Sequence, residues 1–149
     1  MSAVLHLAKP EDIDRLIPLV GAFHEEEGLQ STDEQRTNAL APLLDGSPHG
    51  AVYMIGPSRG PIGYIVITYG WSIEFGGLDG FIDEIYIRPG VRGRGVGSEV
   101  IASLVAMLKS VDMKALHLEV DPEKDRAQRF YKRCHFRKRE GYMLMSRIL

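Results

Sequence analysis

The sequence predicts a mixed α/β domain of the α+β kind, in which a central and mostly antiparallel sheet is flanked by about four helices. Two observations lead to this fold class. Successive strand-like segments in the middle of the chain are separated by short stretches rich in Gly and Pro, which is typical of antiparallel hairpins. A strand–helix–strand unit follows them, and such a unit adds a parallel pair to the sheet.

Length and composition fit a single domain spanning residues 1–149. The chain is 44% hydrophobic and 26% charged, as is usual for a soluble globular protein. Its first residues lack the basic and apolar blocks of a signal peptide, and no apolar run approaches the roughly 18 residues that a membrane span needs. The single cysteine, Cys134, can form no internal disulfide. We therefore expect a cytoplasmic protein.

At the N-terminal end, a short alternating strand precedes two helices. Pro10 suits the first position of the first helix, and Gly28 suits its end. The second helix is weaker: a Ser-Thr-Asp run at residues 31–33 can cap it, and Pro42 should limit it. The predicted segments are a strand at residues 4–8 and helices at residues 9–28 and 31–46.

The middle of the chain is rich in residues that favour strands. Residues 50–56 and 60–71 are bounded by Gly and Pro and predict a β-hairpin. Residues 72–80 predict a loop. The strand predicted at residues 81–89, FIDEIYIRP, should stop at Pro89 because proline cannot donate a hydrogen bond within a sheet.

The last third of the chain completes the strand–helix–strand unit. Apolar residues recur along one face of residues 97–112, which predicts a helix. The final helix should begin with Asp121 as its cap and Pro122 at its first position. The remaining predicted segments are a strand at residues 114–120, the final helix to residue 136 and a closing hairpin over residues 136–149 that turns near Glu140 and Gly141.

The segment Arg88–Ser98, RPGVRGRGVGS, lies between a predicted strand and a predicted helix and combines glycine with arginine. Glycine lets the backbone wrap around an anion, and the free N–H groups of a first helical turn then point at that anion. Arginine adds donors in a planar fork that suits phosphate. We predict an anion site made by Arg92, Gly93, Arg94, Gly95, Val96, Gly97 and Ser98.

Two other kinds of phosphate site fit this segment less well. A dinucleotide fingerprint of the Rossmann type would need its third glycine at Ser98. Residues 89–92 also separate the strand from the glycines, where that fingerprint has a tight turn. A P-loop would need Gly-Lys-Ser/Thr at its end, and the segment contains no lysine.

The segment resembles the R/Q-x-x-G-x-G/A signature of the GNAT superfamily of N-acetyltransferases through Arg92, Gly95 and Gly97. The strand FIDEIYIRP before it and the run RAQRFYKRCHF after it resemble further motifs of the family. The order of the predicted elements is also similar to the GNAT acyl-CoA N-acyltransferase fold. The resemblance implies that acetyl-CoA is the acetyl-donor co-substrate and that the loop binds its pyrophosphate.

The resemblance also implies that the strand backbone pairs with the pantetheine arm of acetyl-CoA, as an added strand would. The residues concerned are Ile85, Tyr86 and Ile87. Two positions depart from the family pattern. Lys124 stands where an asparagine near the coenzyme arm is frequent, and His135 replaces a glycine that takes a positive φ at the helix end. Histidine visits that region more readily than most residues do.

Acetyl transfer to an amine needs a base, an oxyanion donor and an acid. A lysine-like ammonium, with a pKa of ~10.4, is almost wholly protonated at pH 7 and must lose a proton before it attacks. A backbone N–H can stabilise the developing oxyanion, and a nearby acid can protonate the departing thiolate. The resemblance implies that Tyr131 is this acid, although its apolar stripe alone would make it a core residue beside Phe130.

Asp83 and Glu84 are the candidate bases, because two acids within a strongly apolar strand are costly to bury without a purpose. Strand alternation sends them to opposite faces, but the family has a bulge at this strand that makes their facing uncertain. The resemblance implies a base that acts through water, and Asp83 falls where polyamine acetyltransferases have a glutamate. We favour Asp83 over Glu84. The alternative is an acid that hydrogen-bonds a neighbouring loop.

Charge is distributed unevenly along the chain. Residues 1–80 carry 4 basic and 11 acidic side chains, a net charge of −7, whereas residues 81–149 carry 14 and 9, a net charge of +5. A cationic ligand should favour the first half. Acids at a helix end are unfavourable, which suggests that those ending the first helix serve a cation; a solvated loop is the alternative. The expected acceptor-binding residues are Glu25, Glu26, Glu27, Trp71 and Phe75.

The sequence therefore predicts an N-acetyltransferase that moves acetyl from acetyl-CoA to a primary amine by direct attack. A small cationic or polyamine-like amine is the favoured acceptor. An enzyme that acetylates protein N-termini or lysines is one alternative, and a non-catalytic acyl-CoA sensor is another. We expect no metal, nucleic acid or membrane partner, and the family resemblance leaves a homodimer open.

Overall fold

The computed structural model describes residues 4–149, which divide into two compact units, one that ends at Glu119 and one that spans Val120–Leu149. No helix in the described part of the chain is long and apolar enough to cross a membrane.

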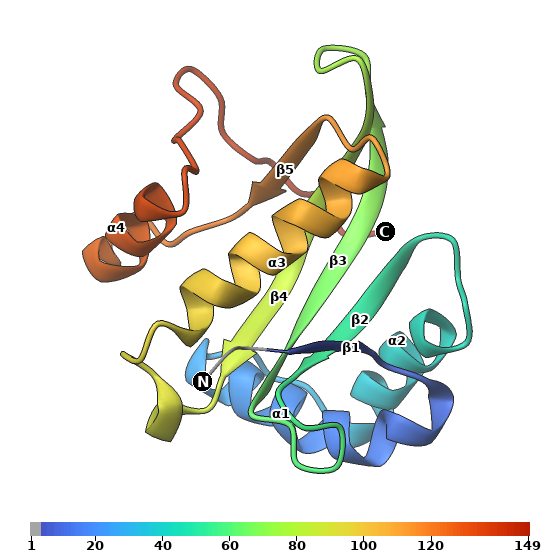
Figure 1. Cartoon of the computed structure of the whole chain (residues 1–149). Coiled ribbons are helices and arrows are strands. Elements are labelled where there is room, and N and C mark those ends of the chain that lie inside the picture. Colours follow the sequence, from blue (N-terminus) through green and yellow to red (C-terminus); the bar gives the residue numbers. More distant parts are fainter. Residues whose placement is uncertain (1–3) are drawn as a thin grey trace. The chain divides into compact units, whose positions relative to one another are not determined.

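The first unit is built on one five-stranded sheet whose strand order follows the sequence (Figure 1). The first four strands run antiparallel to their neighbours, and the fifth is parallel to the fourth. The predicted mixed and mostly antiparallel sheet is therefore confirmed. The strands are β1 (Leu5–Leu7), β2 (Gly50–Ile55), β3 (Gly63–Ser72), β4 (Gly77–Ile87) and β5 (Ala115–Leu118).

Helices cover both faces of this sheet (Figure 1). On one face, Leu16 and Leu40 of the first two helices pack with Val52 and Tyr64 of the strands in a buried cluster. The third helix buries its own apolar stripe on the opposite face, where Ile65 is fully buried because successive strand residues alternate in direction. The helices of this unit are the 3₁₀ turn η1 (Pro10–Asp12), α1 (Ile13–Glu26), α2 (Asp33–Leu44), the 3₁₀ turn η2 (Pro89–Val91) and α3 (Val96–Ser110).

A capping box starts α2. The Thr32 hydroxyl accepts a hydrogen bond from the backbone N–H of Gln35, and the Gln35 side chain accepts one from the N–H of Thr32. The predicted cap within residues 31–33 is therefore confirmed. Pro42 does not limit the helix, which continues to Leu44.

The predicted loop at residues 72–80 is wrong in its second half. β4 already begins at Gly77, and the connection to β3 is a short turn at residues 73–76. Glycine is uncommon in strands, so the segment resembles a loop. Gly80 nevertheless lies within the strand, where it pairs with Tyr69 of β3 and Leu116 of β5.

The second unit contains one helix, α4 (Asp125–Arg133), which starts later than predicted. Asp121 does not cap it. The Asp121 side chain instead accepts from the N–H of Glu123, and its carbonyl accepts from the N–H of Lys124, so the residue closes a turn before the helix.

The predicted hairpin over residues 136–149 is also wrong. A turn forms at Glu140 and Gly141 as expected, but residues 136–149 contain no strand. An alternating apolar sequence becomes a strand only where a partner strand completes its hydrogen bonds, and the described unit Val120–Leu149 has none to offer.

The close approach of β3 to β4 yields a stability prediction. A Cβ at Gly63 would lie 2.0 Å from the carbonyl oxygen of Tyr86, a backbone atom that cannot move without breaking the ladder. We expect Gly63→Ala to lower the free energy of unfolding by about 1–3 kcal/mol, measured by urea denaturation. Gly60→Ala is the matched control, since a Cβ there meets no atom within 4 Å. Equal stability of the two variants would contradict this packing.

Candidate functional site

The ladder between β3 and β4 contains a β-bulge. Val66 pairs with Glu84, whereas the next residue, Ile67, pairs with Ile82, so Asp83 is an extra residue on β4. In a regular strand Ile82 and Glu84 would point to the same face. The bulge turns Ile82 into the core beneath α3 and Glu84 toward the face that α1 covers. The strand can therefore carry two adjacent acids without losing a core residue.

β4 and β5 separate beside this bulge. Their parallel pairing ends at Ile82 and Leu118, and β4 continues for five residues more, to Ile87. Over that stretch β4 pairs with β3 on one side and with no described strand on the other. A free strand edge is where an extended ligand can add backbone hydrogen bonds. This edge is formed by Asp83, Glu84 and the predicted coenzyme-pairing residues Ile85, Tyr86 and Ile87.

Glu84 is held by two donors. The Tyr64 hydroxyl donates to its Oε1 at 2.7 Å, and the His24 Nε2 lies 2.6 Å from its Oε2. The Nδ1 of His24 is in turn 2.6 Å from the Oγ of Ser31. His24 and Glu84 expose only 16% and 18% of their side chains. Burial and the Glu84 charge raise the pKa of Tyr64 far above its ordinary value, so this phenol acts only as a donor.

Asp83 differs from Glu84 in its surroundings, because it is exposed at the bulge. The pKa of Asp83 is raised above its ordinary value, first by partial desolvation of the carboxyl and then by repulsion from Glu84 and Glu119. The neighbouring His24 acts in the opposite direction. A carboxylate with a raised pKa accepts protons more readily than a free aspartate does, which suits a general base.

The Gly-rich loop after β4 has the backbone of an anion site. Gly93 and Gly95 have φ angles of 79° and 80°, a left-handed conformation that side chains rarely adopt. Gly95 is the N-cap of α3, and the first N–H groups of a helix have no carbonyl partner within it. In α3 these belong to Val96, Gly97 and Ser98, whose N–H groups with the helix dipole can bind phosphate.

Arg92 is engaged in three contacts around this loop. Its Nε donates to the carbonyl of Ile87 at 2.8 Å, and its Nη2 donates to the Oε2 of Glu26 at 2.7 Å. The guanidinium also lies over the ring of Tyr86, 5.5 Å from its centroid. Arg92 therefore ties the loop to β4 and to the end of α1. Arg94 is exposed.

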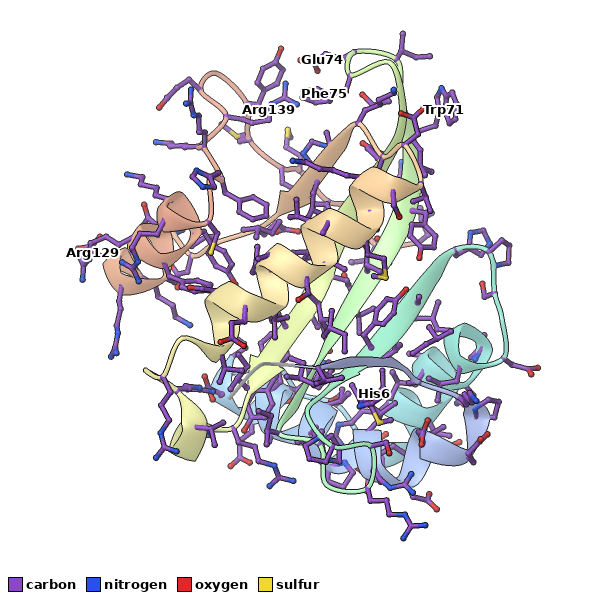
Figure 2. The ribbon with its side chains drawn as sticks, in the orientation of Figure 1. His6, Trp71, Glu74, Phe75, Arg129 and Arg139 are labelled. Atoms are coloured by element: carbon purple, nitrogen blue, oxygen red, sulfur yellow. The ribbon has the colours of Figure 1, made fainter. Side chains whose placement is uncertain are left out.

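The predicted acceptor residues are separated by the fold. Glu25, Glu26 and Glu27 are exposed at the end of α1. Figure 2 shows Trp71 and Phe75 at the far end of the β3–β4 hairpin. Trp71 pairs with Leu78, five residues before Asp83, which is a separation of roughly 17 Å along an extended strand. The structure therefore brings the glutamates, but not Trp71 and Phe75, to the end of the sheet that carries the loop.

The second unit holds the predicted acid. Tyr131 lies on α4 between the rings of Phe130 and Phe136, with ring centroids 5.0 and 5.9 Å away. Lys124 is the N-cap of this helix. His135 has a φ of 71°, so the predicted left-handed turn at this departure from the family pattern is confirmed.

Sequence reasoning missed the partners of Glu84. His24, Ser31 and Tyr64 are far from Glu84 in the sequence, and no spacing pattern relates them. The signal present was an unpaired acid in an apolar strand, which must find donors when it is buried. Among the described residues, no group of three or more His, Cys, Asp or Glu side chains could hold a metal ion.

The model of the Acetyltransferase (GNAT) family matches residues 13–136. An integron cassette protein from the mobile metagenome of Cole Harbour Salt Marsh is 29% identical, with a TM-score of 0.83 over 97% of this chain and 90% of that one. A search of curated proteins found no match.

Two more distant structures share the fold. One is an aminoglycoside acetyltransferase from an uncultured soil metagenomic sample in complex with sisomicin, 13% identical, with a TM-score of 0.81 over 99% of this chain and 96% of that one. The other is a ribosomal-protein-alanine N-acetyltransferase from Brucella melitensis biovar Abortus 2308, 15% identical, with a TM-score of 0.78 over 99% of each chain.

The raised pKa of Asp83 predicts a pH-dependent gain of stability in Asp83→Asn. Because folding raises this pKa, ionised Asp83 opposes folding above the folded-state pKa, and the penalty disappears below the ordinary aspartate pKa. Asp83→Asn should therefore raise the thermal midpoint at pH 7, and the gain should vanish as the pH falls. Asp45→Asn, at an exposed position, should show no such trend. A loss of stability at pH 7 would contradict the assigned environment.

Proposed function

Since the chain belongs to the GNAT family of acetyltransferases, which are acetyl-CoA-dependent enzymes, we propose that it transfers acetyl to a small cationic primary amine by direct attack. The observation that supports this most is the bulge in β4. It presents a carboxylate of raised pKa at the free edge of the strand, between the separation from β5 and the Gly-rich loop.

Acetyl-CoA supplies the acetyl group as an activated thioester. The residues present suit it, because Gly93 and Gly95 shape a loop whose Cβ positions are open and whose helical N–H groups are free for a diphosphate. The edge of β4 from Ile85 to Ile87 pairs with no described strand, and along it the Ile87 carbonyl already accepts from Arg92, so an extended arm could pair with the other backbone groups there. A backbone N–H near Ile85 or Tyr86 would then stabilise the oxyanion.

In this proposal Asp83 is the general base. Its exposure lets it reach the acceptor through a water molecule, whereas the carboxylate of Glu84 is already occupied by His24 and Tyr64. Tyr131 is proposed as the acid that protonates the departing thiolate, with Lys124 near the coenzyme arm. A phenol O–H is a hydrogen-bond donor that can pass its proton to a thiolate leaving group.

The acceptor proposal rests on charge. Asp83 interacts with Glu84 and with Glu119 at the bulge. The end of α1 adds the exposed Glu25 and Glu27, which belong to the half of the chain with a net charge of −7. Such a surface attracts a cationic amine and repels an acidic substrate. The sisomicin complex of a protein with the same fold supports a small molecule. Trp71 and Phe75 are left out of this acceptor site because of their distance from Asp83.

Turnover of Asp83→Asn tests the base. The variant cannot take a proton, so we expect kcat with the best amine to fall by about 10²–10⁴-fold while acetyl-CoA binding stays unchanged. The rate is measured as the CoA thiol released over time, and titration calorimetry gives the affinity for acetyl-CoA. Tyr131→Phe should lower kcat in the same way. Normal turnover by both variants would contradict the assigned roles.

A panel of acceptors separates the remaining functions. Polyamines and aminoglycosides should release CoA thiol faster than acidic amino acids do, because their ammonium groups complement the carboxylates. Faster acetylation of peptides, followed by mass spectrometry, would instead identify a protein acetyltransferase. A non-catalytic sensor would bind acetyl-CoA but release no thiol with any acceptor.

A further inference from the structure

Four side chains form a continuous hydrogen-bonded chain beneath the bulge. It runs from Ser31 through His24 and Glu84 to Tyr64, with successive distances of 2.6, 2.6 and 2.7 Å. Ser31 lies between α1 and α2, His24 on α1, Glu84 on β4 and Tyr64 on β3. One chain of contacts therefore joins the connection between the first two helices to the strand next to Asp83.

The proton arrangement along this chain follows from the donors. Tyr64 donates to one oxygen of Glu84. Because an ionised carboxylate can only accept, the Nε2 of His24 must carry a proton when it bonds the other oxygen. Nδ1 of a neutral His24 then accepts from the Ser31 hydroxyl, whereas a protonated His24 donates to that oxygen. His24 can thus donate a hydrogen bond to Glu84 whether its own ring is neutral or protonated.

Burying the polar side chains of this hydrogen-bonded chain costs free energy, which suggests that their position serves a function. Glu84 and His24 are mostly buried, and a buried carboxylate needs donors in good geometry. An apolar residue in place of Glu84 would leave the buried Tyr64 hydroxyl and the Nε2 of His24 without this partner. The hydrogen bonds also fix the position of this carboxyl group next to Asp83, the exposed extra residue of the bulge.

The groups that face Asp83 act in opposite directions. Glu84 on the same strand and Glu119 after β5 raise its pKa, whereas His24 on α1 lowers it. Glu84 itself is faced by His24, Tyr64 and Asp83. A displacement of Glu84, or a change of charge at His24, must therefore change how readily Asp83 takes a proton.

We propose that His24 is a positioning residue for acetyl transfer, which fixes the Glu84 carboxylate against the bulge and, through Ser31, couples the α1–α2 connection to the protonation of Asp83. This inference rests on the proposed function, because it assigns His24 to the same base. His24 touches neither coenzyme nor acceptor in this scheme. It acts through Glu84.

Two substitutions of opposite effect test the inference through the pH profile of kcat/KM. The acidic limb reports the protonation of Asp83, which must be ionised to act. His24→Gln keeps an amide donor for Glu84 but cannot become charged, so the limb should move to higher pH. Glu84→Gln removes the repelling carboxylate, so the limb should move to lower pH. Unmoved limbs, or shifts in the same direction, would overturn the inference.

The size of kcat separates positioning from folding. His24→Ala removes the donor to Glu84 and should lower kcat by about 10- to 100-fold with unchanged affinity for acetyl-CoA, and His24→Gln should restore part of the rate. Ser31→Ala removes only the outer hydrogen bond and should cause a smaller loss. If His24→Ala does not fold, His24→Gln and Ser31→Ala decide. The control His49→Gln, at an exposed position, should leave rate and profile unchanged.

The controls also distinguish the two proposals. A wild-type enzyme that is active, with Asp83→Asn inactive and both His24 variants normal, would overturn the role of His24 and leave the proposed function standing. A wild-type chain without acetyl transfer to any amine would overturn both.

Discussion

The hydrogen-bond ladder between β3 and β4 holds one residue more on β4 than on β3, and the geometry of the site follows from that extra residue. Because of it, Ile82 is buried on one face of the sheet while Glu84 turns to the other, and Asp83 stands exposed between them. The same position marks the last pair between β4 and β5. In a strand with strict alternation, Ile82 and Glu84 would point to the same face, so the isoleucine would leave the core or the glutamate would enter it.

The site concentrates negative charge that the fold only partly balances. Desolvation and the charges of Glu84 and Glu119 disfavour the ionised form of Asp83, and His24 offsets this only in part. Proteins keep such arrangements where function requires them, because a neutral residue at the bulge would be more stable. A cationic acceptor would supply the missing charge, which is how an unfavourable cluster becomes a binding determinant.

The last turns of α1 contact β4 and its loop at two places. His24 binds Glu84, and two residues later Glu26 binds Arg92, which also donates to the carbonyl of Ile87. Acids at the C-terminal end of a helix oppose its dipole. The ion pair with Arg92 offsets this unfavourable position of Glu26. It also joins the C-terminal end of α1 to the loop proposed to hold the coenzyme.

The sequence by itself determined the first three helices, the central hairpin, the loop with its signature and the positive φ of His135, because periodicity, caps and glycine act within a few residues. Contacts between distant segments decided the rest. Gly80 belongs to β4 because Tyr69 and Leu116 pair with it, and Glu84 meets His24 only because α1 packs on that face of the sheet. The spacing of residues along the sequence does not show which residue is left unpaired between two strands. Only the tertiary structure could therefore distinguish the exposed Asp83 from the hydrogen-bonded Glu84.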